Sequence, residues 1–246
     1  MKNILLISLL TMAGLAGNTA SAKVSVMINQ QPYVFTNEPR LVDVLAPMAA
    51  QQNWYWPAAA IYEMENSELE QTRQRVLKQL STLAKAQLPK DPQNIFAIEQ
   101  LAADIASWTL ARRLPIAIDY DLARIEAAAN PQFTQGNYLL RLTLRPKVVH
   151  VWGAVNYSQH LAHQAHADVS QYNTEQSLTD LADKDYVIII QADGAVVKAP
   201  LAYWNKAHQE VMPGGQLFVP FKESLFSPEL SKINQQILKL AVNRVL

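Results

Sequence analysis

Cysteine is absent from all 246 residues of the chain. Its absence excludes disulfides, thiolate metal sites and lipid attachment to an N-terminal cysteine, so the fold must be held together by its own core. Glycine is scarce, with seven residues, and neither a phosphate-binding glycine loop nor a G-x-S-x-G nucleophile motif occurs.

An excess of either charge is also lacking, because 21 Lys and Arg balance 21 Asp and Glu. A nucleic-acid-binding domain is usually strongly basic, so nucleic acid is not an expected partner. Beyond the N-terminus, no apolar run approaches the roughly 20 residues that a membrane-spanning helix needs. We therefore expect no membrane span in the mature chain, and no motif indicates a cofactor.

The N-terminus has the order of features found in a secretory signal peptide. Lys2 supplies a positive charge, residues 4–10 form an apolar run, and an Ala-Ser-Ala cleavage motif ends at Ala22. The apolar run is too short for a spanning helix, and a retained N-terminal anchor is the alternative. We expect removal of residues 1–22 and a mature periplasmic protein that begins at Lys23.

The sequence after Lys23 alternates between β and helical patterns. Residues 24–28 alternate in hydrophobicity, and a turn, a return strand and a short helix follow them. Two amphipathic helices come next, the first beginning with a capping box at Ser67 and the second running from about residue 93 to 112. Because strand-like alternation resumes at Ile116, we expect these helices to form a hairpin inserted between β segments.

A second β unit begins near Lys147. Strands are expected at residues 149–155, 186–191 and 217–219, and the Asp193-Gly194 pair indicates a hairpin turn after the second of them. Its order of strand, helix, hairpin and final strand is similar to that of the first unit.

The C-terminal residues predict an amphipathic helix with Ser227 as N-cap and Pro228 at its first position. Its apolar stripe consists of Leu230, Ile233, Ile237 and Leu240. Polar residues placed off that stripe include Asn234, Lys239 and Asn243. Because so many polar groups do not suit lipid, we expect the stripe to dock on the protein's own body, at the second β unit.

Three histidines recur at every third position of a polar segment: His160, His163 and His166. On a helix they would share a face and could bind zinc or copper. No carboxylate stands at a spacing typical of a metal site. Incidental histidines on a solvated loop are therefore the preferred interpretation, and no metal is predicted.

Asp119 and Asp121 would share one face if they lay on a strand. A glycosidase needs two carboxylates at a defined separation, which this spacing does not establish. Polarity of a turn or strand edge is the preferred interpretation, so no catalytic residue is assigned.

Arg112 and Arg113 end the second inserted helix. They either compensate the helix dipole or bind the carboxylate or phosphate of an anionic sugar. Trp56, Tyr203 and Trp204 are aromatic residues near expected loops, where a ring can stack on a sugar. Core packing is the preferred interpretation for the two tryptophans.

Four stretches carry a family resemblance: residues 56–59, 114–124, 130–138 and 198–206. The last reads Lys-Ala-Pro-Leu-Ala-Tyr-Trp-Asn-Lys and is followed by Met-Pro-Gly at 212–214. Through them the chain resembles the GfcC-like family of periplasmic proteins, encoded with group 4 capsule and related exopolysaccharide genes.

The resemblance implies an α+β fold of two β-grasp domains, similar to the SLBB-like domains of outer-membrane polysaccharide export channels. The first domain carries the helical hairpin, and an amphipathic helix ends the chain. The implied ranges are 1–22 for the signal peptide, 23–50 and 114–146 for the first β-grasp domain, 51–113 for the helical insertion, 147–223 for the second β-grasp domain and 224–246 for the C-terminal helix.

The resemblance also implies a non-enzymatic, accessory role in capsular polysaccharide or exopolysaccharide biosynthesis or export. Its partner would be an anionic polysaccharide or the export proteins of the envelope, and the protein is expected to be a monomer. The resemblance marks Arg113 as the family's arginine before a β segment. Trp56, Tyr203 and Trp204 are the further ligand-binding candidates, as aromatic residues near expected loops. A carbohydrate-active lyase or hydrolase and an envelope scaffold without glycan contact are the alternatives.

Overall fold

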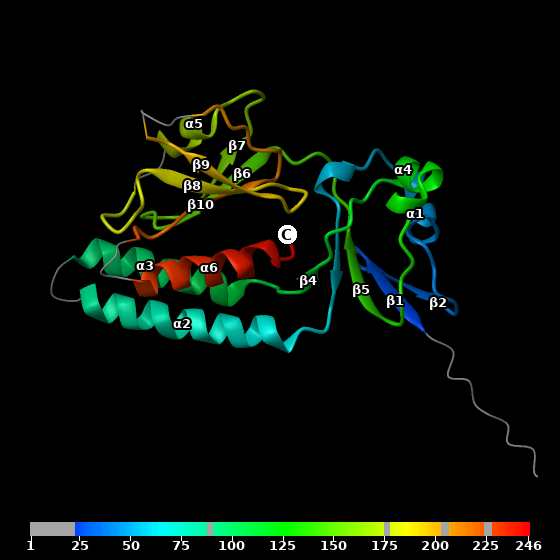
Figure 1. Ribbon diagram of the computed structural model, residues 1–246, viewed down its shortest axis with the longest axis horizontal. Helices are drawn as coiled ribbons and strands as arrows, with labels where there is room; N and C mark the ends of the chain where they lie inside the picture. The colour runs from blue at the N-terminus through cyan, green and yellow to red at the C-terminus, as the bar shows by residue number, and fades with distance from the viewer. Residues whose placement is uncertain (1–22, 88–90, 175–177, 203–206, 224–227) are drawn as a thin grey trace, which may run out of the picture.

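The computed structural model describes residues 23–87, 91–174, 178–202, 207–223 and 228–246 (Figure 1). The expected signal peptide lies outside the described residues. Within them, two five-stranded mixed sheets stand side by side, and a layer of helices covers one face of the second sheet.

The first sheet has the strand order β2-β1-β5-β3-β4. Its strands are β1 (Val24–Ile28), β2 (Gln31–Phe35), β3 (Ala60–Glu63), β4 (Arg112–Arg113) and β5 (Gly136–Arg141). Strands β1 and β5 are parallel, and the other pairs are antiparallel. The alternation of β1 places Val24, Val26 and Ile28 in a core with α1 (Leu41–Ala49).

The second sheet repeats this arrangement in the order β7-β6-β10-β8-β9. Its strands are β6 (Val148–Gly153), β7 (Gln159–Ala162), β8 (Tyr186–Ile190), β9 (Val196–Pro200) and β10 (Gln216–Val219). The helix α5 (Val169–Thr174) precedes β8, as α1 precedes β3. Both units are therefore β-grasp-like, and the expected α+β fold is confirmed.

The inserted helices are α2 (Ser67–Gln87) and α3 (Pro92–Ser107). They connect β3 to β4, the position that the short Asp193-Gly194 turn occupies between β8 and β9 in the second unit. The range 51–113 was expected to be a helical insertion. Apart from a short 3-10 turn, its helices lie only between residues 67 and 107. The strands β3 and β4, which fall within the same range, belong to the first sheet because they pair there.

The start of α2 differs from the expected capping box at Ser67. Asn66 is the capping residue, since its Oδ1 accepts hydrogen bonds from the backbone N–H groups of Glu68 (3.0 Å) and Leu69 (3.3 Å). Ser67 is instead the first residue of the helix. Asparagine caps a helix as well as serine does, so the boundary moves by only one residue.

The C-terminal helix α6 (Pro228–Val242) docks on the body of the protein, as the sequence predicts. Ile233, Ile237 and Leu240 are buried in one core with α2, α3 and the second sheet, and Leu230 is partly buried against it. The inserted helices thus follow a strand of the first sheet yet pack beneath the second (Figure 1).

Asn234 was expected off the apolar stripe but is buried, with 3% of its surface exposed. Its Oδ1 accepts from the backbone N–H of Phe221 (2.9 Å), and its Nδ2 donates to the Phe221 carbonyl (2.8 Å). This side chain therefore ties α6 to the segment after β10.

Among the described residues, no helix has both the length and the apolar character to cross a bilayer.

Candidate ligand-binding site between the two sheets

A cavity of about 240 Å³ lies between the two sheets. Strands β3, β4 and β5 of the first sheet and β6 and β10 of the second contribute to its lining. Arg113, Arg141 and Arg244 line it, and no Asp or Glu among the described residues does so. Three guanidinium groups without an Asp or Glu side chain favour an anionic ligand. We call this space the arginine cavity.

Arg113, the arginine singled out from the sequence, reaches from the first sheet to the second. Its backbone N–H donates to Asn243 Oδ1 (2.9 Å), and its Nη2 donates to the carbonyl oxygen of Ala192 (2.8 Å) in the β8–β9 turn. That turn can approach so closely because Gly194 has no Cβ atom. A Cβ atom at this position would lie 2.7 Å from Arg113 Nε. A guanidinium has five N–H donors, so donors remain for a ligand.

The other two arginines are also held at the boundary. Arg141 Nε donates to a main-chain oxygen of Leu246 (3.0 Å), and the Arg244 guanidinium lies over the Trp108 ring, 4.9 Å from its centroid. Burial lowers the pKa of Arg244, although an arginine remains charged in proteins. In the described ranges, none of the three arginines forms an ion pair with an Asp or Glu side chain.

The residues that follow α6 connect the second unit to the first sheet. The backbone N–H of Val245 donates to the Thr109 carbonyl (2.9 Å), and the Tyr62 hydroxyl donates to the Arg244 carbonyl (3.2 Å). Burial raises the pKa of the Tyr62 hydroxyl, which therefore stays protonated as a donor. These contacts fix the walls of the arginine cavity relative to each other.

Two buried polar atoms of the lining side chains lack a partner among the described residues. They are His150 Nδ1 and Gln216 Oε1, which belong to register partners on β6 and β10. Burial lowers the pKa of His150 to about 4, and the nearby Arg244 guanidinium acts in the same direction. His150 is therefore neutral at neutral pH, and the positive charge of the cavity comes from its arginines.

Of the remaining binding candidates, Trp56 does not line the arginine cavity. Trp56 begins a 3-10 turn, Trp56–Ala58, and packs partly buried against the core of the first sheet. Tyr203 and Trp204 lie outside the described residues. Sequence reasoning missed Arg141 and Arg244, because nothing in their spacing indicates that the last residues of the chain meet β5.

The three histidines do not share a helical face, so the geometry behind the metal-site alternative is wrong. His160 lies on β7 with its ring 4.3 Å from that of His150. His163 Nε2 lies 3.0 Å from the Val211 carbonyl oxygen, and His166 is exposed. Among the residues described, no group of three or more His, Cys, Asp or Glu could hold a metal ion.

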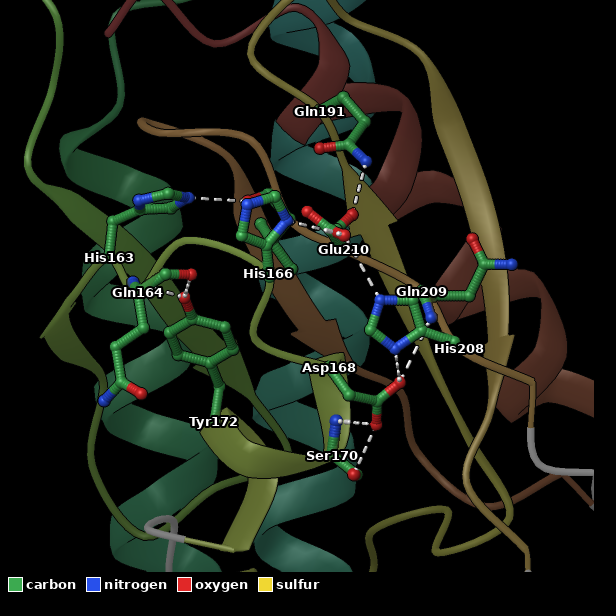
Figure 2. A network of polar contacts seen from close by, with 11 residues as sticks. His163, Gln164, His166, Asp168, Ser170, Tyr172, Gln191, His208, Gln209 and Glu210 are labelled. Carbon is green, nitrogen blue, oxygen red and sulfur yellow. Dashed lines mark hydrogen bonds and ion pairs between the residues drawn. The ribbon is translucent and has the colours of Figure 1, made fainter.

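A network of polar contacts surrounds His208 instead (Figure 2). Its Nδ1 lies 3.6 Å from Asp168 Oδ2, its Nε2 lies 3.2 Å from Glu210 Oε1, and His166 Nδ1 lies 3.6 Å from that same oxygen. The hydrogen bond from His208 lowers the pKa of Glu210. An antiparallel β-bridge between Asp168 and Glu210 brings these two segments together, although they are distant in the sequence. No local sequence pattern indicates this contact.

Asp119 and Asp121 do not lie on a strand, and the alternation at Ile116 does not produce one. Asp119 is the N-cap of α4 (Tyr120–Ile125), where its Oδ1 accepts from the Leu122 N–H (2.9 Å). Asp121 is exposed in the first turn of α4. Capping explains the pair, and the two carboxylates do not converge on the arginine cavity.

Comparisons with known proteins identify the family of the chain. Residues 19–145 match the family model described as capsule biosynthesis GfcC, N-terminal, and residues 157–246 match capsule biosynthesis GfcC, C-terminal. The chain is also similar to the uncharacterized protein YjbG of Escherichia coli K12, with 29% identity over 242 residues, 98% of this chain and 97% of that relative. The chain therefore belongs to the GfcC capsule biosynthesis family.

Proposed function

We propose that this protein is a non-enzymatic periplasmic factor for biosynthesis or export of a surface polysaccharide, and that its arginine cavity binds an acidic group of the polymer. The family supports the link to capsule biosynthesis. The lining, with three arginines and no Asp or Glu side chain among the described residues, carries the proposal.

An acidic polysaccharide presents carboxylates or phosphates, which guanidinium groups bind through paired N–H donors. Arg113, Arg141 and Arg244 come from β4, β5 and the C-terminal segment, so a bound anion would connect parts of the chain that are distant in sequence. The signal-peptide pattern at residues 1–22 supports the periplasmic location.

A deletion strain, complemented with wild-type protein or with Arg113→Gln, tests the role in the cell. We expect the deletion and Arg113→Gln to lower surface polymer while intracellular precursor persists, which would favour export over synthesis. The matched control is Arg124→Gln, because Arg124 is exposed on α4 and does not line the cavity. Normal surface polymer with stable Arg113→Gln protein would contradict the role of the cavity.

A further inference from the structure

A second cavity, of about 340 Å³, lies beside the arginine cavity, at the ends of the parallel strands β1 and β5. Arg141 lines both cavities, so the two are neighbours. Four amide side chains belong to the lining of the second one: Asn29, Gln30, Gln31 and Gln51. We call this space the amide cavity. Its volume falls in the range of small-molecule binding sites, which is about 300–1,000 Å³.

Asn29 holds the turn between β1 and β2 against the end of β5. Its φ of +54° lies in the left-handed region, which asparagine adopts more readily than most residues. Its backbone N–H donates to the Leu140 carbonyl (2.9 Å), and its Oδ1 accepts from the Leu142 N–H (2.9 Å). The register that pairs Ile28 with Leu140 places Asn29 next to Arg141. An amide and a guanidinium therefore stand side by side where the two cavities meet.

Three of the amides bond to the protein at one end only and have an unpaired end among the described residues. Asn29 uses its Oδ1, which leaves Nδ2 to donate. Gln31 Oε1 accepts from the Tyr33 hydroxyl (3.2 Å), so Gln31 Nε2 also remains a donor. Gln51 is reversed, because its Nε2 donates to the Pro47 carbonyl (2.8 Å) and its Oε1 remains an acceptor. The amide cavity thus offers donors and an acceptor together.

The amide groups of this cavity are open to a ligand. Gln30, Gln31 and Gln51 are exposed residues, and Asn29 is only partly buried. The unpaired Nδ2 of Asn29 keeps accessible surface, since it is not one of the fully buried, unpaired atoms of the described residues. Buried apolar side chains complete the lining: Ile28, Met48, Trp54 and Leu142.

Amides with unpaired donors and acceptors match the hydroxyl groups of a sugar. A hydroxyl both donates and accepts, so it can bond to Asn29 Nδ2 or Gln31 Nε2 and to Gln51 Oε1. Among the described residues of the lining, Arg141 carries the only charged side chain. Hydrogen bonds to the neutral amides need no charge on the ligand, so binding through them should depend little on salt.

We infer that the amide cavity binds the hydroxyl groups of a sugar residue, next to the acidic residue held in the arginine cavity. This inference rests on the proposed function and adds to it a second subsite that recognises hydroxyl groups instead of charge. Arg141 links the two subsites because it lines both. The polymer would then contact the protein through consecutive sugar residues.

The test is an NMR titration of ¹⁵N-labelled protein that follows the side-chain amide resonances of Gln31, which are assigned through Gln31→Ala. The probes are methyl glucoside, methyl galactoside and methyl mannoside, each raised to about 50 mM so that a millimolar site fills. We expect at least one of them to shift the Gln31 resonances saturably, at low and at high salt alike. Glucuronate should shift the backbone N–H of Gly194 at the arginine cavity, and this response should weaken as salt rises.

Two variants at neighbouring exposed positions complete the test. Gln51→Ala should weaken the response to the neutral glycoside about fivefold, the effect of one lost hydrogen bond. The matched control is Gln52→Ala, at an exposed residue that does not line the amide cavity, and it should respond like the wild type. Both variants should keep the melting temperature of the wild type, because exposed substitutions change stability little.

Gln31 resonances that no neutral glycoside shifts saturably would overturn the inference, as would equal responses of Gln51→Ala and the wild type. A missing glucuronate response at Gly194 would instead count against the proposed function alone.

Discussion

The side chain of Arg113 packs directly against the backbone of Gly194, across the boundary between the two sheets. Gly194 has a φ of +93°, and a Cβ atom there would lie 2.7 Å from Arg113 Nε. The turn residue of one β-grasp unit therefore leaves the space in which the arginine of the other unit is held. Glycine at position 194 therefore allows both the conformation of the hairpin turn and the position of Arg113 in the arginine cavity.

Gly194→Ala should both destabilise the protein and displace Arg113. The positive φ alone costs about 1–2 kcal/mol for a residue with a Cβ, which urea unfolding measures. Anion binding should also weaken, because the guanidinium loses its position. The control is Gly136→Ala, at a glycine without a positive φ whose Cβ would lie nearest the flexible Tyr138 side chain, at 3.3 Å. Unaltered stability and binding in Gly194→Ala would contradict the proposed packing role.

Ile237→Ala should lower the free energy of unfolding by about 2–5 kcal/mol, because it leaves a cavity in a fully buried core. Lys239→Ala on the exposed side of α6 should change it by at most about 1 kcal/mol, since Lys239 forms only an exposed ion pair with Glu68. Equal effects of the two substitutions would mean that α6 does not hold the second unit together.

Asn234→Ala should lower the free energy of unfolding by about 1–3 kcal/mol, because it leaves the backbone N–H and carbonyl of Phe221 buried without their partner. Thermal unfolding of this variant beside Gln235→Ala, at the exposed neighbouring position, measures the difference. A melting temperature that matches the control would show that water replaces the amide.

The stability of the protein should fall as the pH decreases below neutral, in part through His150. Its pKa is lowered from 6.5 to about 4 in the folded state, mainly by burial. The unfolded chain therefore binds a proton first, and the contribution of neutral His150 is lost as the pH falls from about 6.5 to about 4. His150→Gln should flatten this part of the stability profile, whereas parallel profiles for the two proteins would refute the assignment.

Much of the fold could be predicted, because it follows from local patterns. The Asp193-Gly194 pair forms the expected hairpin turn, and the spacing of Ile233, Ile237 and Leu240 identifies the buried face of α6. These signals depend on neighbouring residues alone. The strand β4 has only two residues, so its periodicity is too short to detect.

The candidate site could be predicted only in part, because its geometry is non-local. Arg113 was identified through a family resemblance, yet its partners Ala192 and Asn243 are far away in the sequence. The packing of α2 and α3 beneath the second sheet depends on which apolar surface is left uncovered after folding. An amphipathic pattern shows that a helix has a buried face, but not what covers it.

Calorimetric titration of the protein with oligogalacturonate tests the central claim most directly. The wild type should bind this uronic-acid probe with an affinity that falls as salt rises, and Arg113→Gln should bind at least about tenfold more weakly, since a hydrogen bond to a charged group is lost. Arg124→Gln should bind like the wild type, and neutral dextran oligomers should not compete for the arginine cavity. A wild type that gives no saturable binding to the uronic-acid probe, or an Arg113→Gln variant that binds it as tightly as the wild type, would contradict the claim that the arginine cavity holds an acidic sugar.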